Sequence, residues 1–186
     1  MKAVISSLVL ACAAGASQLV FCQPAPAIPD SEVINQIEKE YWAKENLHSS
    51  MQTALEITLY IALPDRYYLT KLDENRLKQV GCEYKTGDPK LIADLIKTID
   101  DSDLQGENFS LQNFEYREAI YLHTSNDKKI AIKFGRAYEN YPKLLGLADG
   151  RKIAAKKSLL EDLYRFAAKL DPVRKCEYFI GRFRGK

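Results

Sequence analysis

Histidine is scarce in this chain of 186 residues, which contains only His48 and His123. Neither has a second histidine at ligand spacing, so the sequence offers no histidine-based metal site. Two enzyme motifs are also missing: the Gly-x-Ser-x-Gly turn that carries a hydrolase nucleophile, and the glycine-rich run that cradles a phosphate. We therefore expect no metal and no other cofactor, and we expect that the protein is not an enzyme.

An excess of charge of either sign is absent as well. Lysine and arginine number 27, and aspartate and glutamate number 25, which gives a net charge of +2. This balance lacks the basic footprint of a nucleic-acid-binding protein. The acidic run of Asp100, Asp101 and Asp103 lacks the glycine and the terminal glutamate of an EF-hand. It therefore predicts a solvated helix end and not a calcium site.

Long apolar runs are missing except near the N-terminus. Lys2 is followed by the mostly apolar residues 3–21 and then by Cys-Gln-Pro-Ala-Pro-Ala, which is the three-part layout of a secretory signal peptide. Small residues at the −3 and −1 positions allow cleavage after Ala16 or after Ala27. The second position is favoured because it leaves a short polar stretch after the last bulky apolar residue. We therefore expect residues 1–27 to be a signal peptide and the mature chain to be periplasmic.

Two other interpretations of the N-terminus stay open. A transmembrane anchor needs roughly 18–20 predominantly apolar residues, and here three serines and Gln18 interrupt the run. A lipoprotein signal would place a lipid on Cys12, because Leu8-Val-Leu-Ala-Cys12 resembles a lipobox, although the apolar run continues after it. If cleavage follows Ala27, the mature chain has no stable membrane span.

Cysteine is limited to four residues. Cleavage after Ala27 removes Cys12 and Cys22 and leaves Cys82 and Cys176, an even count that predicts a disulfide in an exported chain. Closing a loop of about 95 residues stabilises a fold by roughly 4–5 kcal/mol in the chain-entropy model. The bond would staple two strands together or tie the C-terminal tail to a sheet. The alternative is a pair of buried free thiols.

Residues 28–186 are long enough for one domain with a single core. Apolar periodicity predicts helices over residues 30–45, 73–80, 88–99 and 158–170, and strands over residues 55–63, 67–72, 82–86, 118–124 and 129–135. The last two strands form the clearest element, a β-hairpin, and Asp149-Gly150 predicts a second reversal. Gly81 is expected to end a helix in the left-handed conformation, and Ser158 to cap the last helix.

Strands that alternate between apolar and polar residues have one solvated face, and hairpins build antiparallel sheets. The expected fold class is therefore α+β: a single domain with an antiparallel sheet of four to six strands and two or three helices packed on one face.

Aromatic and polar loops are the strongest candidates for a binding surface. Tyrosine occurs eleven times, and several copies lie where no core pattern requires them. Tyrosine buries a large area at a modest entropic cost, which suits it to interfaces. The alternative is that these rings cover the sheet. The candidate partner-binding residues are Asp103, Gln105, Glu107, Asn108, Phe109, Tyr138, Glu139 and Tyr141.

The order of elements from Tyr67 to Leu170, together with the signal peptide, the hairpin of residues 117–135 and the terminal helix from Ser158, resembles a known class of exported bacterial proteins. These are the periplasmic immunity proteins that neutralise antibacterial effectors of type IV or type VI secretion systems. The resemblance implies a non-enzymatic inhibitor whose partner is a cognate protein effector, and a homodimer remains open.

Two alternative functions have recognisable requirements. An envelope module that binds a small ligand would need Tyr121, His123 and Lys133 clustered on one concave face of the sheet. A hydrolase would need two carboxylates converging in a cleft, Glu115 with Glu118 or Asp149, one of them with a raised pKa.

Overall fold

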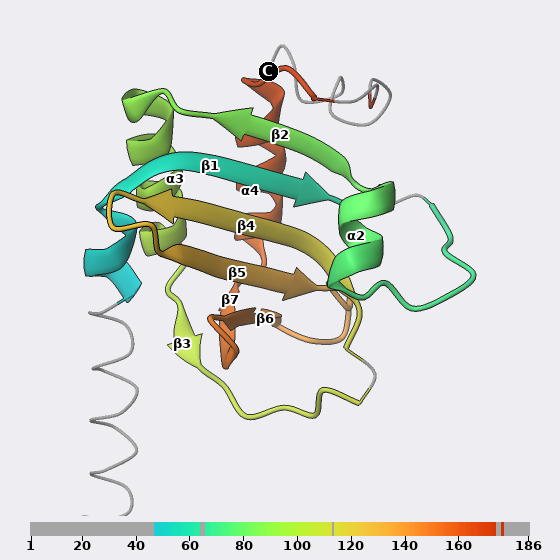
Figure 1. The fold of residues 1–186 in the computed structure, drawn as a ribbon. Helices are drawn as coiled ribbons and strands as arrows, with labels where there is room; N and C mark the ends of the chain where they lie inside the picture. Colours follow the sequence, from blue (N-terminus) through green and yellow to red (C-terminus); the bar gives the residue numbers. More distant parts are fainter. Residues whose placement is uncertain (1–46, 64–65, 113, 174–175, 177–186) are drawn as a thin grey trace, which may run out of the picture.

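A seven-stranded antiparallel sheet forms the centre of the protein in the computed structural model, which describes residues 47–63, 66–112, 114–173 and 176 (Figure 1). The predicted signal peptide, with its alternatives, and the helix predicted over residues 30–45 lie outside the described residues. The strand order is β2-β1-β4-β5-β6-β7-β3. The strands are β1 (Ala54–Ile61), β2 (Cys82–Thr86), β3 (Gln105–Gly106), β4 (Tyr116–Thr124), β5 (Lys129–Gly135), β6 (Lys143–Ala148) and β7 (Arg151–Lys156). The α+β fold is confirmed, with more strands than the four to six predicted.

Two hairpins build the middle of this sheet. The predicted hairpin is confirmed as β4 and β5, with Ile120 opposite Ile132. The predicted reversal at Asp149-Gly150 joins β6 to β7. Both turn residues have positive φ, 46° and 81°, which is the geometry of a tight two-residue hairpin turn. The Asp149 carboxylate accepts a hydrogen bond of 2.8 Å from the Ala131 N–H, which ties this turn to β5.

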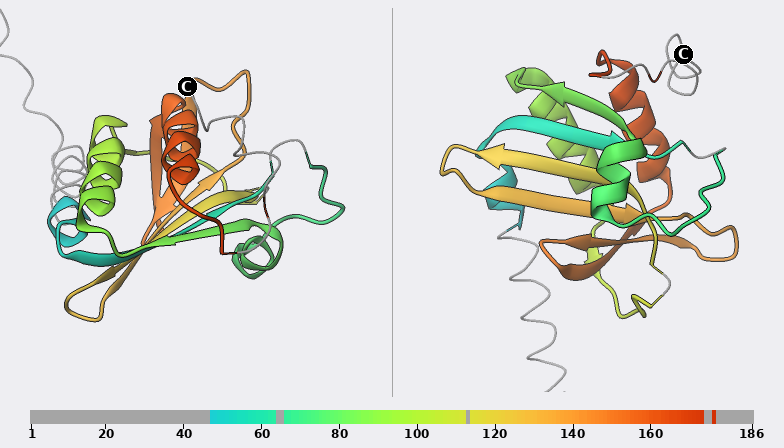
Figure 2. Two further views of the ribbon diagram at one scale, coloured as in Figure 1. Left: turned by 90° about the horizontal axis from the view of Figure 1, so that it is seen from above. Right: turned by 45° about the vertical axis from the view of Figure 1, so that its right-hand side comes forward.

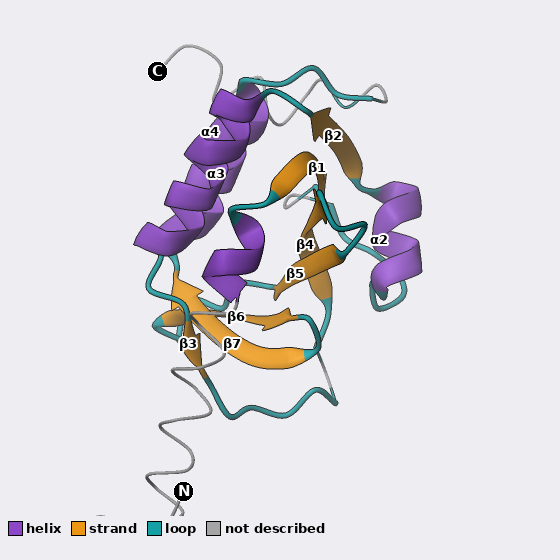
Figure 3. Cartoon of the chain, turned by 60° about the vertical axis from the view of Figure 1, so that its left-hand side comes forward, coloured by secondary structure: helices purple, strands orange, loops and turns teal. Residues whose placement is uncertain are grey.

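Helices cover both faces of the sheet. On one face, α3 (Pro89–Asp101) and α4 (Ser158–Ala168) lie side by side over the main core (Figures 2 and 3). On the opposite face, Leu77 of α2 (Glu74–Val80) packs against Ala119 and Tyr121. The two helices on the first face agree with the predicted two or three helices packed on one side of the sheet, and α2 is an additional helix on the other side. Ala119 and Tyr121 alternate with Ile120 and Leu122 along β4, so this strand is buried on both of its faces.

The ends of the helices agree with the sequence in part. Asp73 caps α2 as predicted, because its carboxylate accepts a hydrogen bond from the Arg76 N–H. Gly81 follows α2 with φ −76°, so the predicted left-handed conformation is wrong. A Cβ at Gly81 would lie 2.6 Å from a carbonyl oxygen in the last turn of α2, and this close approach accounts for the glycine. Ser158 is the first residue of α4 and not its cap.

The strand predicted over residues 67–72 is also wrong, because this segment is a loop. Its Tyr-Tyr-Leu-Thr-Lys-Leu sequence has strand-like residues, but a strand needs a free edge to pair with. Both edges of the preceding strand, β1, are already occupied by β2 and β4. The chain therefore leaves the sheet after β1 and returns to it through the fully buried Leu72.

The predicted disulfide between Cys82 and Cys176 is confirmed, with a Cα–Cα distance of 5.6 Å. It joins the C-terminal segment to β2, next to an isolated antiparallel bridge between Tyr84 and Pro172. The Val173 N–H donates a hydrogen bond of 2.8 Å to the Glu83 carbonyl. Pro172, Val173 and Cys176 are thus held at the outer edge of β2, where they occupy part of an edge that could otherwise pair with another chain. Across residues 47–63, 66–112, 114–173 and 176, no helix is long and apolar enough to cross a membrane.

Candidate protein-binding surface

Two loops that the sequence singled out lie next to each other in the structure. Residues 103–112 leave α3, pair briefly with β7 through β3, and continue towards β4. Residues 138–143 comprise most of the connection from β5 to β6 and the first residue of β6. We call these two segments together the loop surface. All eight candidate partner-binding residues belong to it.

Lys143 stands where the two loops meet. Its ammonium nitrogen lies 2.9 Å from a carboxylate oxygen of Glu107, 36 residues earlier in the chain. The hydrogen bond with Glu107 raises the pKa of Lys143, and the charges of Glu107, Tyr141 and Asp103 act in the same direction. Lys143 therefore has three candidate residues around it. The sequence did not identify Lys143, because its partner is remote in the chain and no local pattern predicts the pairing.

An aromatic row fixes the loop surface to the end of the hairpin. The Phe109 ring lies 5.4 Å from that of Phe114, and Phe114 makes an edge-to-face contact of 5.3 Å with Tyr116. Gly135, at the end of β5, allows this packing, because a Cβ there would lie 2.7 Å from the Phe114 ring. Phe109 is half-buried, so at this position the ring covers the sheet as much as it offers a contact surface.

The exposed part of the loop surface is polar and aromatic. Tyr138 is 52% exposed, and Glu139, Asp103, Gln105 and Asn108 are exposed as well. The Lys157 ammonium group donates hydrogen bonds to the carbonyl oxygens of Tyr138 and Glu139. These bonds hold the backbone of the loop while both side chains stay accessible. The structure therefore presents Tyr138 and Glu139 from a backbone that is tied to the start of α4.

The residues predicted for a ligand-binding face do not form an open pocket. Tyr121 is only 2% exposed, and its hydroxyl donates a hydrogen bond of 2.6 Å to Glu74 of α2. Lys133 and Lys78 donate to the same carboxylate at 2.6 and 2.7 Å. Partial burial alone would raise the pKa of Glu74, but the hydrogen bonds from Lys133, Lys78 and Tyr121 outweigh it and lower the pKa to about 2. His123 is exposed, whereas α2 covers Tyr121 and Lys133.

The three carboxylates considered for a hydrolase have separate partners. Glu115 pairs with Arg117 at 3.2 Å, and Asp149 accepts its hydrogen bond from the β5 backbone. Glu118 is buried between the sheet and α4, 2% exposed, where it accepts a hydrogen bond of 2.9 Å from the Tyr164 hydroxyl. Burial raises its pKa to about 8, although the Tyr164 hydrogen bond and the charge of Arg117 act the other way. Glu118 therefore has the raised pKa that a hydrolase would need, but its carboxyl group lies in the core and not in a cleft.

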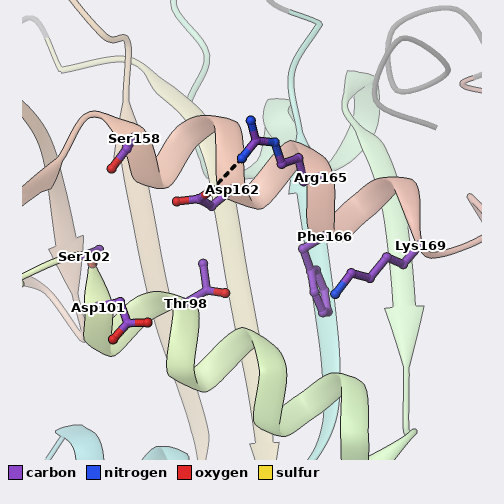
Figure 4. Close-up of a pocket in the computed structure, with 8 residues that line it drawn as sticks. All are labelled: Thr98, Asp101, Ser102, Ser158, Asp162, Arg165, Phe166 and Lys169. Atoms are coloured by element: carbon purple, nitrogen blue, oxygen red, sulfur yellow. Dashed lines mark ion pairs between the residues drawn. The ribbon is translucent and has the colours of Figure 1, made fainter. Parts of the chain in front are cut away.

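A groove of about 360 Å³ runs between α3 and α4 (Figure 4). It is lined by Thr98, Asp101, Ser102, Ser158, Asp162, Arg165, Phe166 and Lys169. Three of the charged side chains at its rim are paired: Arg165 with Asp162 at 3.6 Å, and Lys169 with Asp94 at 3.2 Å. In the part of the chain that the structure describes, no group of three or more His, Cys, Asp or Glu side chains could hold a metal ion.

No protein-family model, no curated protein and no solved structure matches this chain. The resemblance to periplasmic immunity proteins therefore stays a hypothesis, and the functional inference depends on the geometry described above.

Proposed function

We propose that this chain is an exported immunity protein that binds a toxic secreted enzyme in the periplasm and blocks it. The observation that carries the proposal is the contact between Glu107 and Lys143, which joins two loops into one exposed surface. The Cys82–Cys176 disulfide further supports export, because structural disulfides persist in oxidising compartments and are rare in the cytosol.

Inhibition would follow from occlusion. The loop surface is held by side-chain bonds to the sheet and to the start of α4, so little conformational freedom is lost when it docks. Tyr138 supplies apolar area together with a hydroxyl, and Glu139 supplies a carboxylate beside it. An enzyme whose cleft accepts these two side chains loses access to its substrate without any chemistry on the part of the inhibitor.

The two alternative functions receive less support. A small-ligand module would need Tyr121 and Lys133 accessible, yet α2 covers both of them and Glu74 binds both. A hydrolase would need Glu118 in contact with solvent and substrate, yet this residue lies beneath α4.

The test uses the oxidised exported chain and the secreted enzyme encoded by the gene next to it. Titration calorimetry measures the dissociation constant, and a turnover assay of the enzyme measures inhibition. We expect a complex of one chain per active site, with Tyr138→Ala and Glu139→Lys each weakening binding by roughly 10-fold or more, as for central interface residues. Glu161→Lys, on the exposed side of α4, is the matched control and should bind like wild type. If the enzyme keeps full activity in a saturating excess of the chain, the proposal is wrong for this enzyme.

A further inference from the structure

The loop of residues 66–71, between β1 and α2, has two unusually exposed apolar side chains. Tyr67 is 85% exposed and Leu69 is 92% exposed, more than any other large hydrophobic residue in the described chain, among which Leu55 follows at 63%. The loop projects beyond the end of the sheet at which β1 and β5 finish (Figure 1). Single exposed apolar residues are common on protein surfaces, but two on one projecting loop suggest an interaction site.

Contacts below the tip fix the position of this loop. Tyr68, between the two exposed residues, is half-buried: its hydroxyl accepts a hydrogen bond of 3.1 Å from the Leu63 N–H, and the Arg117 guanidinium lies 5.1 Å from its ring centre. Leu72 is fully buried, and its carbonyl accepts a hydrogen bond of 3.0 Å from the Tyr116 N–H. Because Tyr68 and Leu72 are anchored, the backbone that carries Tyr67 and Leu69 is held in place.

The 66–71 loop is continuous with the loop surface. The Lys71 ammonium group donates a hydrogen bond of 3.0 Å to the carbonyl of Gln112, at the end of the segment 103–112. A partner that covers the loop surface would therefore meet the 66–71 loop at its border. The sequence pattern does not predict this role, because it favours a strand at Tyr67 and Leu69.

We propose that Tyr67 and Leu69 form an apolar wedge that inserts into a concave apolar cleft of the secreted enzyme. This inference rests on the proposed function and deepens it, because it names the chemistry of the partner site. A convex tip needs a concave partner, and two neighbouring apolar side chains need an apolar lining. Apolar side chains that are fully desolvated in a pocket of the partner carry much of the binding energy in protein interfaces.

Two other occupants fit the observations less well. A second copy of the chain would have to offer a matching apolar hollow, but the groove between α3 and α4 is rimmed by charged side chains. An anionic lipid surface would attract Arg66 and Lys71 of the loop, but it would repel the exposed carboxylates of Asp103 and Glu139 on the adjoining loop surface. Lipid adducts are therefore one of the outcomes that the cross-linking below separates.

Site-specific photo-cross-linking tests the wedge directly. Benzoylphenylalanine replaces Tyr67, Tyr138 or Leu55 in three separate variants of the full chain, which are irradiated in cells that receive the secreted enzyme. Leu55, at the start of β1 and at the opposite end of that strand, is the matched control. We expect adducts of one secreted enzyme from Tyr67 and Tyr138 and none from Leu55, identified by mass spectrometry.

The outcomes separate the two proposals. Adducts from Tyr138 alone would retain the inhibitor function and overturn the wedge, as would adducts of Tyr67 with a second copy of the chain or with lipid. If neither position is linked to a secreted enzyme, the proposed function fails as well. A second measurement uses Tyr67→Ala with Leu69→Ala, which should leave the melting temperature unchanged and raise the dissociation constant by roughly 30-fold or more, whereas Leu55→Ala should change it less than about 2-fold.

Discussion

Replacing Glu118 by glutamine should remove a pH-dependent loss of stability that arises in the core. Glu118 is 2% exposed, and among the described residues its second carboxylate oxygen has no hydrogen-bond partner. Its pKa is raised from 4.5 to about 8 in the folded protein, mainly by burial. The folded state therefore binds this proton more tightly than the unfolded state does. The stability gained in this way is fully present below about pH 4.5 and is lost as the pH rises towards 8.

The size of the effect follows from the two pKa values. Linkage with pKa values of about 4.5 unfolded and about 8 folded gives a loss of about 2.5 kcal/mol of unfolding free energy between pH 5 and pH 7. A folded pKa one unit lower still gives about 2 kcal/mol. Glutamine cannot titrate, so the free energy of unfolding of Glu118→Gln relative to wild type should rise by that amount over the same interval. Any pH-independent cost of burying the amide cancels in this comparison.

Urea denaturation at half-unit pH steps from 4.5 to 8 measures the difference. Titration of all other carboxylates is common to both proteins and cancels. Glu161→Gln, exposed on α4, is the control and should give a curve parallel to that of wild type. Tyr164→Phe removes a hydrogen bond that lowers the pKa of Glu118, so its loss of stability should extend to higher pH. If the curves of wild type and Glu118→Gln stay parallel within about 0.5 kcal/mol, Glu118 is not a buried protonated acid.

Two further perturbations test the scaffold. Replacing Cys82 and Cys176 together by alanine should lower the free energy of unfolding by about 2–4 kcal/mol, measured by urea denaturation; a reductant should destabilise wild type and leave the double variant unchanged. Gly135→Ala should cost about 1–3 kcal/mol, because its Cβ would lie 2.7 Å from the Phe114 ring. Gly87→Ala, where the nearest atom is 3.6 Å away, is the control, and equal melting temperatures for the two variants would contradict the aromatic row.

Local patterns predicted the elements whose signals are local. The hairpin of β4 and β5 has strict alternation of apolar residues, and α3 begins at Asp88-Pro89 with a regular apolar stripe, so both were found from the sequence. The loop at Tyr67 is not predictable in this way, because composition reports strand propensity and not whether a sheet edge is free. The short strand β3 has only two residues and depends on β7, nearly fifty residues later.

Among the polar sites, too, some are predictable from local sequence and others depend on partners that are remote in the chain. Glu118 lies two and four residues before Ile120 and Leu122, so strand periodicity alone places its carboxylate on the core face. A buried carboxylate at position 118 is therefore predictable from local spacing. The Glu74 cluster, by contrast, joins Lys133 to a carboxylate 59 residues away, and Lys143 likewise depends on a remote partner. No spacing rule within one element predicts such pairs.

In this protein, clusters of charged side chains hold elements of the fold together, whereas several large aromatic and apolar side chains are exposed on the loops. Glu74 ties α2 to β4 and β5 through Tyr121 and Lys133, and Glu107 ties one loop to another through Lys143. Tyr67, Leu69 and Tyr138 are instead largely exposed. Substitutions in the bracing clusters should therefore change stability first and binding only in consequence. Substitutions at the exposed rings and at Leu69 should change binding while the unfolding free energy stays constant, and this separation distinguishes a recognition surface from residues that serve only the fold.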